Sequence, residues 1–302
     1  MGSKDYLLLL RPINVGMITA MTIAGMWFGN PTFSFPSTLI NYLFGIVVAI
    51  AYSGIAMIHN DIIDIEIDRI NAPHRALPSG RVSKKAALLY MAILFVIGTS
   101  VGVWLRIESV LIMFITLVLS LLYNWRLKKT GFIGNLIVGY TATSAFIYGD
   151  AVSAGFSHFW PPSNWNASVY LFLISALLNT SREVTKGIMD MEGDRKYGVK
   201  TIAVKYGPKF ASRFVIVLNC LALLLAIIPV VEGVFGPVFI IAAASFLGLM
   251  LLNGVPLLKK PNYETAKKFK DYLHPIMLLA LVLVVIDIIL ADILHVYETL
   301  GT

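Results

Sequence analysis

Two groups of aspartate residues carry the most distinctive chemistry in this sequence. The members are Asn60, Asp61, Asp64 and Asp68 in the first group, and Asp190 and Asp194 in the second. Intervals of three and four residues place side chains on one face of an α-helix, so the carboxylates of each group project together. Clustered carboxylates repel one another unless cations lie between them. Because carboxylate oxygens without His or Cys favour Mg²⁺ or Ca²⁺, the groups predict a site for a diphosphate bridged by two Mg²⁺ ions.

The two groups occur in similar strings of sequence. The pattern D-x-E-x-D-R occupies residues 64–69 and occurs again at residues 190–195. Each copy follows an apolar segment and lies in a long polar connection, residues 60–83 and 183–209. A single aspartate at a helix end is commonly a cap or a solvated charge. The duplicated spacing instead favours a functional site built from two related halves of the chain.

Basic residues close to the aspartates are candidates for binding the diphosphate. A cation beside a departing diphosphate stabilises the negative charge that grows on it. The candidates are Arg69, Lys128, Lys186 and Arg195. Loops on the cytoplasmic side of membrane proteins are basic for reasons of topology alone, so each candidate also has this ordinary explanation.

The elements that must position these residues are membrane-spanning helices. Of the 302 residues, 58% are hydrophobic and only 14% are charged, and the mean hydropathy is +0.79. Apolar segments of spanning length occur nine times. We predict spans near residues 11–29, 38–59, 84–104, 107–124, 131–150, 167–182, 210–231, 234–253 and 273–294. The fold class is therefore all-α and integral to the membrane, with one domain over residues 1–302, two four-helix repeats and a ninth helix.

The distribution of charge predicts the orientation of the spans. With nine spans, all of the 24 lysines and arginines except Arg106 fall on the side that holds the N-terminus. The positive-inside rule makes that side cytoplasmic. We therefore expect a multi-pass protein of the plasma membrane, with the N-terminus and both aspartate connections in the cytoplasm and the C-terminus outside. This partition also explains the net charge of +7 without nucleic acid as a partner.

The combined motifs resemble those of the UbiA superfamily of intramembrane prenyltransferases. Asn60, Asp64 and Asp68 match the family's N-x-x-x-D-x-x-x-D motif, and Asp190 and Asp194 match its D-x-x-x-D motif. The run at residues 69–83 is similar to the family's continuation, although Ala76 stands where proline is common. The opening Arg11-Pro12-x-Asn14 and the run Tyr123-Asn124-x-x-x-Lys128 after the fourth span also look like family positions.

The resemblance implies a fold and a set of roles. It implies nine transmembrane helices around a central cavity, with cytoplasmic cap loops over the two motifs. It also implies Mg²⁺, an isoprenyl diphosphate and an apolar tunnel for the isoprenyl tail. The residues implied to hold Mg²⁺ and diphosphate are Asn60, Asp61, Asp64, Asp68, Asp190 and Asp194. Tyr123 and Lys128 are implied to contact the diphosphate.

Within the superfamily, the runs at residues 68–83 and 123–131 are most similar to the archaeal digeranylgeranylglyceryl phosphate synthases. That similarity implies transfer of a geranylgeranyl group to geranylgeranylglyceryl phosphate during ether-lipid synthesis. An aromatic acceptor, such as 4-hydroxybenzoate or a naphthoate, is the alternative within the superfamily. The expected partners are the isoprenyl diphosphate, a lipophilic acceptor and membrane lipid, with no obligate protein partner.

A cation-coupled transporter is the alternative from another class of membrane protein. Carboxylates inside membranes often bind coupling ions, but transporter sites usually lie near the bilayer midplane. The aspartates here lie at the cytoplasmic ends of spans, which favours a charged headgroup as the ligand. No His or Glu stands out as a catalytic base, and Asp287, inside the last span, is expected to pack or form hydrogen bonds.

Overall fold

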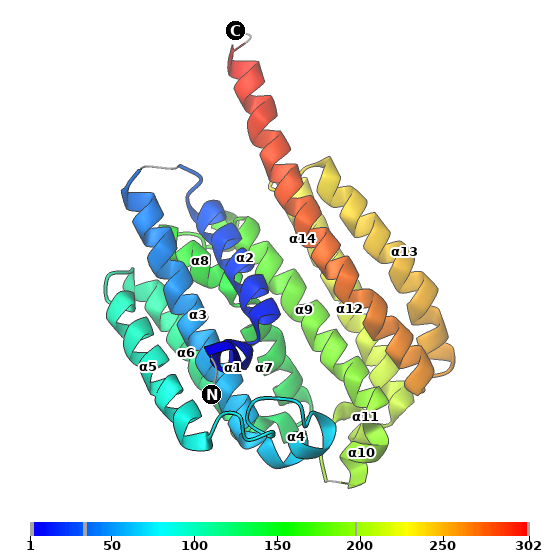
Figure 1. Cartoon of the computed structure of the whole chain (residues 1–302). Coiled ribbons are helices and arrows are strands. Elements are labelled where there is room, and N and C mark those ends of the chain that lie inside the picture. The colour runs from blue at the N-terminus through cyan, green and yellow to red at the C-terminus, as the bar shows by residue number, and fades with distance from the viewer. Residues whose placement is uncertain (1–2, 33–34, 197, 301–302) are drawn as a thin grey trace. The chain divides into compact units, whose positions relative to one another are not determined.

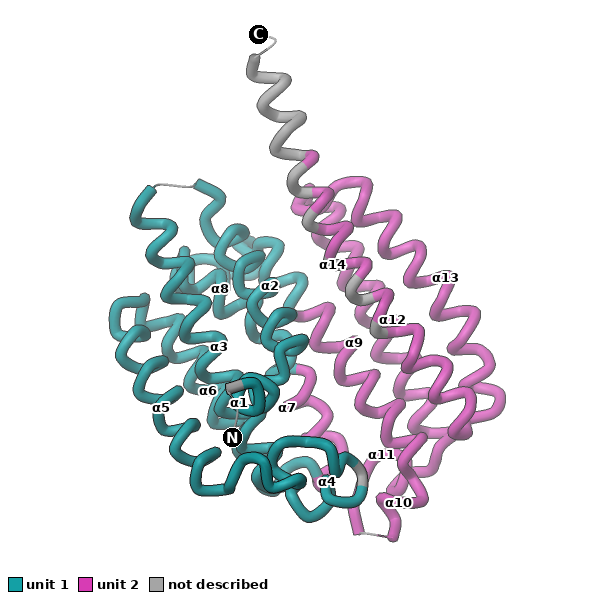
Figure 2. Tube along the Cα trace, in the orientation of Figure 1, with its two compact units in different colours: residues 1–128, 140–172 teal, residues 129–139, 173–302 magenta. Residues whose placement is uncertain are grey.

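The computed structural model describes residues 3–32, 35–196 and 198–300. Within these ranges the regular secondary structure is helical and contains no strand (Figure 1). The chain divides into two compact units, shown in teal and magenta in Figure 2. Unit 1 comprises residues 1–128 and 140–172, and unit 2 comprises residues 129–139 and 173–302. The all-helical fold class predicted from the sequence is thus confirmed.

Unit 1 is built around one long central helix. Its helices are α1 (Ser3–Leu9), α2 (Pro12–Gly29), α3 (Ser37–Ile63), α4 (Ile65–Asn71), α5 (Lys84–Gly102), α6 (Ile107–Trp125), the end of α7 (Phe132–Thr143), α8 (Ala145–Ala154) and the start of α9 (Ala167–Met189). Helix α3 packs against α2, α5, α6 and α8. Its residues Val48, Ala49, Tyr52, Ile55 and Ile58 are buried in the apolar core of the unit. This packing fixes the direction of the α3 end that carries the first aspartate group.

Glycine residues allow α2 and α8 to lie in close contact. A Cβ atom at Gly25 would overlap the carbonyl oxygen of Phe146, and one at Gly149 would overlap the carbonyl oxygen of Thr22. Both glycines are therefore required by the approach of the two backbones, as is common between membrane helices. The Tyr148 hydroxyl donates a hydrogen bond of 3.0 Å to the Gly45 carbonyl and ties α8 to α3.

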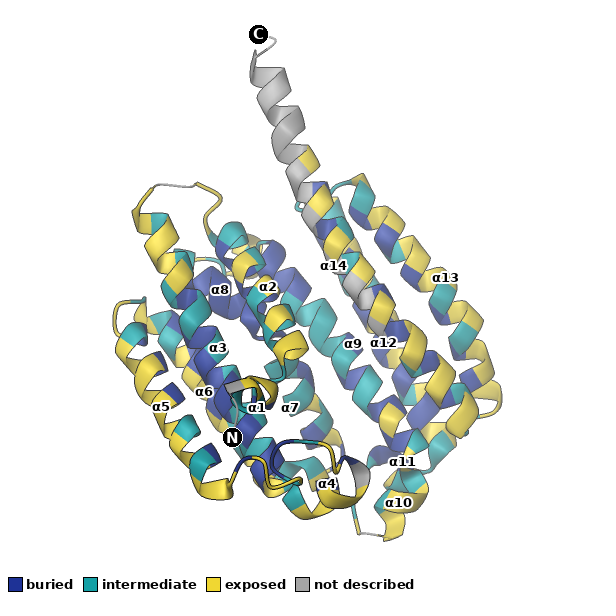
Figure 3. Cartoon of the chain, viewed as in Figure 1, coloured by how far each residue is buried: buried dark blue, intermediate teal, exposed yellow. Residues whose placement is uncertain are grey.

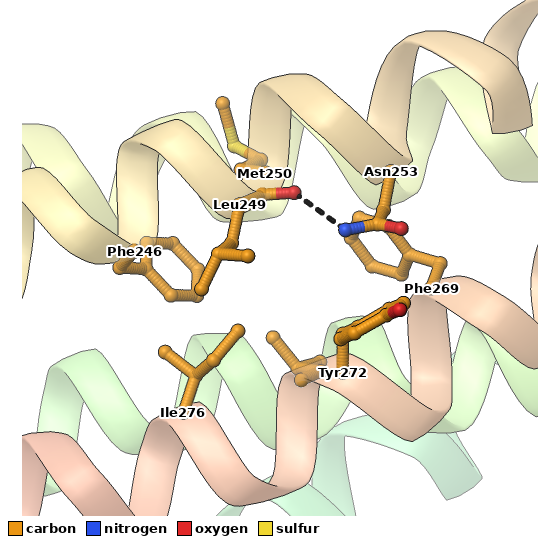
Figure 4. A pocket seen from close by; sticks show the side chains of 8 residues that line it. Phe246, Leu249, Met250, Asn253, Phe269, Tyr272 and Ile276 are labelled. Atoms are coloured by element: carbon orange, nitrogen blue, oxygen red, sulfur yellow. Dashed lines mark hydrogen bonds between the residues drawn. The ribbon is translucent and has the colours of Figure 1, made fainter.

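Unit 2 combines five whole helices of the described chain with parts of two others. They are the start of α7, most of α9, α10 (Met191–Lys196), α11 (Ile202–Tyr206), α12 (Pro208–Val231), α13 (Pro237–Lys259) and α14 (Tyr263–Leu300). The core of the unit combines Val184 of α9, Val215 of α12, Leu257 of α13 and Phe269 of α14. A small groove between α13 and α14, lined mainly by apolar side chains such as Phe246 and Ile276, contains no member of the aspartate groups (Figure 4).

Asp287 of α14 forms hydrogen bonds rather than joining a catalytic cluster. Its side chain accepts hydrogen bonds from the backbone N–H groups of Gly236, at 2.5 Å, and Val238, at 3.0 Å. These donors lie at the N-terminus of α13, where the helix has no internal acceptors for them. Asp287 therefore caps α13 from a neighbouring helix, and the expectation that it is a hydrogen-bonding residue is confirmed.

Among the described residues, five helices are long and apolar enough to cross a membrane: α3, α5, α6, α12 and α13. Large apolar side chains lie on their outer surfaces, among them Val96 of α5, Phe114 of α6 and Leu252 of α13, which are 61%, 50% and 71% exposed. Figure 3 shows much of α5 in the exposed colour. Surfaces of this size and polarity are stable in lipid rather than in water.

The helices differ in several places from the spans expected from the sequence. The fifth span, 131–150, is two helices, because α7 ends at Thr143 and α8 begins at Ala145. Helix α14 begins at Tyr263, about ten residues before the apolar segment, since hydropathy marks the lipid boundary and not the end of a helix. The polar connections 60–83 and 183–209 are partly helical, because they include the ends of α3 and α9 and the helices α4, α10 and α11.

Candidate active site

The first aspartate group lies where α3 ends and α4 begins. Asp64 is the residue between the two helices, with φ −95° and ψ 10°. Backbone hydrogen bonds continue through this junction, from Asp64 N–H to the Asn60 carbonyl at 3.0 Å and from Asp68 N–H to the Asp64 carbonyl at 2.7 Å. The helical progression is thus nearly unbroken, and the side chains of Asn60, Asp64 and Asp68 follow one another at intervals of one turn.

Asn60 connects the aspartate group to its surroundings. Its amide nitrogen donates to Asp64 Oδ2 at 3.1 Å and to Asn124 Oδ1 at 3.3 Å, and its Oδ1 accepts from Arg11 Nη2 at 3.0 Å. Asn124, at the end of α6, donates in turn to the Ala56 carbonyl at 2.9 Å. These bonds fix the amide so that its nitrogen faces Asp64, which orients the carboxylate.

Each carboxylate in the first group has a basic partner. Lys128 forms an ion pair with Asp64, Arg11 forms one with Asp61, and Arg75 Nη1 lies 2.7 Å from Asp68 Oδ2. The Asp61 side chain is only 5% exposed, whereas that of Asp64 is 19% exposed. Asp61 therefore lies beneath the guanidinium groups, and Asp64 is the more accessible carboxylate.

Arg11 reaches Asn60 and Asp61 from an unusual backbone conformation. It lies between α1 and α2 with φ 51° and ψ 75°, the left-handed region that residues other than glycine seldom occupy. Such a conformation costs on the order of 1–3 kcal/mol and persists where other contacts enforce it. Here the contacts are those of its guanidinium group with the two side chains of α3.

The second aspartate group repeats this geometry in unit 2. Asp190 lies between α9 and α10, its N–H donates to the Lys186 carbonyl at 3.0 Å, and Asp194 N–H donates to the Asp190 carbonyl at 2.8 Å. Partial burial raises the pKa of Asp194, and the neighbouring Asp190 raises it further, against the lowering effects of Thr201 and Lys186. In both copies a long helix therefore ends at an aspartate, and a short helix presents a second aspartate one turn later.

The structure places the remaining candidates around these two groups. Arg69 pairs with Glu66 at 2.8 Å and its side chain is 59% exposed, so it does not contact an aspartate of its group. Arg195 and Lys186 are exposed near the second group, and Tyr123 is half-buried beside Asn124. Arg11 and Arg75 form ion pairs with aspartates of the first group, and neither was among the predicted site residues. Their sequence signals were the Arg11-Pro12 pair and the position of Arg75 in the loop that follows the first aspartate group.

The carboxylates of each unit fit a Mg²⁺ site that is completed by phosphate oxygens. No cluster of three or more His, Cys, Asp or Glu side chains able to hold a metal ion occurs among the described residues. Mg²⁺ is nevertheless usually bound by one or two carboxylates together with waters and substrate phosphates. Asp64 with Asp68, and Asp190 with Asp194, each provide such a pair of oxygen ligands.

A known protein family and a sequence relative match most of this chain. The sequence profile of the UbiA prenyltransferase family matches residues 18–282. The chain is 35% identical to the digeranylgeranylglyceryl phosphate synthase of Methanocaldococcus jannaschii over 286 residues, which cover 95% of this chain and 96% of the relative.

Two solved structures have the same fold. One, described as a structural and mechanistic study of digeranylgeranylglyceryl phosphate synthase in membranes, is 33% identical, has a TM-score of 0.79, and aligns over 94% of this chain and 97% of its own. A UbiA homologue from Archaeoglobus fulgidus bound to DMAPP and Mg²⁺ is 17% identical, with a TM-score of 0.64 and coverage of 90% and 99%. The extent of these matches and the motifs at Asp64 and Asp190 lead to one conclusion: the chain belongs to the UbiA prenyltransferase family.

Proposed function

We propose that this protein transfers a geranylgeranyl group from geranylgeranyl diphosphate to the free hydroxyl of geranylgeranylglyceryl phosphate. The observation that carries the proposal is the arrangement of Asn60, Asp64 and Lys128, an amide, a carboxylate and an ammonium group held together at the end of α3. The identity of the acceptor is proposed from relatives named as digeranylgeranylglyceryl phosphate synthases. One of these relatives is 35% identical over nearly the whole chain.

Asp64, Asp68, Asp190 and Asp194 are the residues proposed to hold Mg²⁺, with two ions bridging the diphosphate. Bound Mg²⁺ would neutralise the charge that develops on the leaving diphosphate. Asp61 would have to release Arg11 before it could reach a metal ion. We therefore assign Asp61 to positioning Arg11 beside Asn60, and the four other aspartates to metal binding.

The basic residues of this chain stabilise the leaving group. Lys128, 24% exposed and paired with Asp64, can contact both a carboxylate and a diphosphate oxygen, because its ammonium group carries three donors. Lys186 and Arg195 are proposed to act in the same way near the second group. Arg69 and Tyr123 are proposed as outer contacts, since Arg69 is largely exposed and Tyr123 half-buried.

Transfer exchanges one carbon–oxygen bond for another. The bond between C1 of the geranylgeranyl group and the diphosphate oxygen breaks, and both electrons leave with the diphosphate. The acceptor hydroxyl oxygen forms the new ether bond to C1, and its proton passes to the departing diphosphate. Positive charge on the allylic carbons must be shielded from water during this exchange, which an apolar cavity in the bilayer provides.

The same proposal includes a specific membrane arrangement. Nine spans surround a central cavity, in two four-helix repeats and a ninth helix, with the N-terminus and the aspartate groups in the cytoplasm of the cell and the C-terminus outside. The support comes from the one-sided distribution of lysine and arginine and from the similar helix–aspartate–helix junctions at Asp64 and Asp190. Membrane lipid is then the only partner required besides the two substrates.

Transfer by the purified protein in detergent tests this function directly. Radiolabelled geranylgeranyl diphosphate is offered with geranylgeranylglyceryl phosphate or with 4-hydroxybenzoate, with Mg²⁺ or with a chelator. We expect an ether-lipid product from the glycerol acceptor, lost with the chelator and in Asp64→Ala and Asp194→Ala. Product from the aromatic acceptor alone would overturn the acceptor assignment. No transfer and no Mg²⁺-dependent binding of the diphosphate by folded protein would favour a cation-coupled transporter.

A further inference from the structure

Helix α9 carries a polar stripe that extends well beyond the second aspartate group. The stripe consists of Ser175, Asn179, Arg182, Lys186 and Asp190. Successive members are three or four residues apart, so all of them lie on one face of the helix. They are half-buried or exposed, whereas residues on the opposite face, including Val184, Thr185 and Ile188, are buried inside unit 2. The polar face of α9 is thus more open than the face that packs in the core of unit 2.

Arg182 is the member of this stripe whose hydrogen bonds are incomplete. Its Nη1 donates to Glu183 Oε1 at 3.3 Å, whereas its Nε is buried and has no acceptor among the described residues. A buried donor without a partner is costly, and more so on a charged group. The Nε–H and one N–H of Nη2 point along the same edge of the guanidinium group, the edge that binds two oxygens of a phosphate at once.

The position of Arg182 separates it from the diphosphate ligands of its own unit. Arg182 precedes Asp190 by two helical turns, which is about 12 Å along the axis, and Lys186 lies about midway. No other lysine or arginine comes before it in α9. Charged side chains within membrane helices face a polar cavity or the bundle interior and not lipid. Arg182 is thus the first cation along the more open, polar face of α9.

We propose that Arg182 binds the phosphate monoester of the acceptor, at a subsite distinct from that of the donor diphosphate. The inference rests on the proposed transferase function and specifies how the acceptor is selected. Both substrates carry phosphate, but the carboxylates at Asp190 and Asp194 mark the place of the metal-bound donor. The acceptor phosphate at Arg182 would lie two turns before Asp190 in α9. The acceptor hydroxyl, a few bonds from that phosphate, would then lie between Arg182 and the donor diphosphate. Glu183 is a positioning residue that holds the other edge of the guanidinium group.

Acceptors with and without the phosphate distinguish this role from others. In the full-length protein with Mg²⁺, Arg182→Gln should raise the KM for geranylgeranylglyceryl phosphate by about 10- to 100-fold, the loss expected for hydrogen bonds to a charged group. The KM for geranylgeranyl diphosphate should remain within about twofold, because the donor keeps its own ligands. Activity with geranylgeranylglycerol, which lacks the phosphate, should be the same in both proteins. Arg213→Gln, which removes an exposed arginine of α12, is the matched control and should behave as wild type.

Equilibrium binding of radiolabelled geranylgeranylglyceryl phosphate, without donor or Mg²⁺, tests the subsite independently of catalysis. Wild type should bind it more tightly than geranylgeranylglycerol, and Arg182→Gln should lose this preference. If Arg182→Gln does not fold, Arg182→Lys, which keeps the charge but not the two-donor edge, should show a smaller loss of the same kind. Three results would each overturn the subsite. They are a raised KM for the donor in Arg182→Gln, an equal loss of activity with both acceptors, and a wild type that binds both acceptors equally well. If wild type prefers the phosphorylated acceptor in binding but transfers no geranylgeranyl group to it, only the proposed transferase function would be overturned.

Discussion

Lys128 and Lys129 are neighbours in the chain but differ in their surroundings. Lys128 is 24% exposed and pairs with Asp64, whereas the side chain of Lys129 is exposed. We expect Lys128→Met to lower kcat by about 10²- to 10³-fold, the usual loss when one donor to a developing charge is removed. Lys129→Met should remain within about twofold of wild type, as an exposed substitution away from the site. Equal losses in the two variants, measured as initial rates at saturating substrate, would contradict a specific role for Lys128.

Asp61 and Asp64 are close in sequence but differ in what they contact. Asp61 is nearly buried under Arg11 and Arg75, and Asp64 contacts Asn60 and Lys128. We expect Asp61→Asn to reduce kcat and thermal stability but to leave the Mg²⁺ concentration for half-maximal rate within about twofold. Asp64→Asn should raise that concentration by at least about tenfold, because it removes a proposed ligand. A Mg²⁺ titration of both variants tests this difference. A large rise in the half-maximal Mg²⁺ concentration for Asp61→Asn would show that Asp61 is a metal ligand after all.

At the scale of single elements, the approach of α2 to α8 depends on residues without side chains. A Cβ at Gly25 would overlap the backbone of α8, whereas one at Gly16 of the same helix would meet nothing within 4 Å. We expect Gly25→Ala to destabilise the protein by about 1–3 kcal/mol, the cost of overpacking. Gly16→Ala should be neutral or slightly stabilising, since alanine favours helix.

Thermal inactivation in detergent at a fixed heating rate compares the glycine variants on equal terms. An unfolding temperature for Gly25→Ala as high as that of Gly16→Ala would show that the two helices can separate at little cost. Activity measured below both unfolding temperatures should be similar, because neither glycine contacts the aspartate groups.

At the scale of the whole molecule, the one-sided distribution of basic residues predicts which ends of the spans face the cytoplasm. Cys220 is the single cysteine, so a Cys220→Ser background allows one new cysteine to be placed at a time. In intact cells, a membrane-impermeant maleimide should label Trp104→Cys, between α5 and α6, and should not label His74→Cys until the cells are opened. Both positions are exposed, so accessibility within the fold does not confound the comparison. The reverse labelling pattern would contradict the orientation.

The sequence alone was sufficient to predict the fold class, the family and the aspartate motifs. Lipid requires long apolar segments with internally satisfied backbones, and this requirement is visible directly in hydropathy. Spacings of three and four residues were equally informative, because side chains at these intervals lie on one face of any α-helix, whatever the rest of the chain does. The helix–aspartate–helix junctions at Asp64 and Asp190 follow from this local geometry. The nine spans and the role of each site residue stay predictions.

Only the tertiary structure decided which cation meets which carboxylate. Arg11 is 50 residues from Asp61 in the chain and Lys128 is 64 residues from Asp64, so no local pattern could pair them. The break between α7 and α8, the cap that Asp287 provides to α13, and the burial of the Arg182 Nε likewise depend on neighbouring helices. Local spacing determines the face on which a side chain lies, whereas the packing of distant helices determines what that face meets.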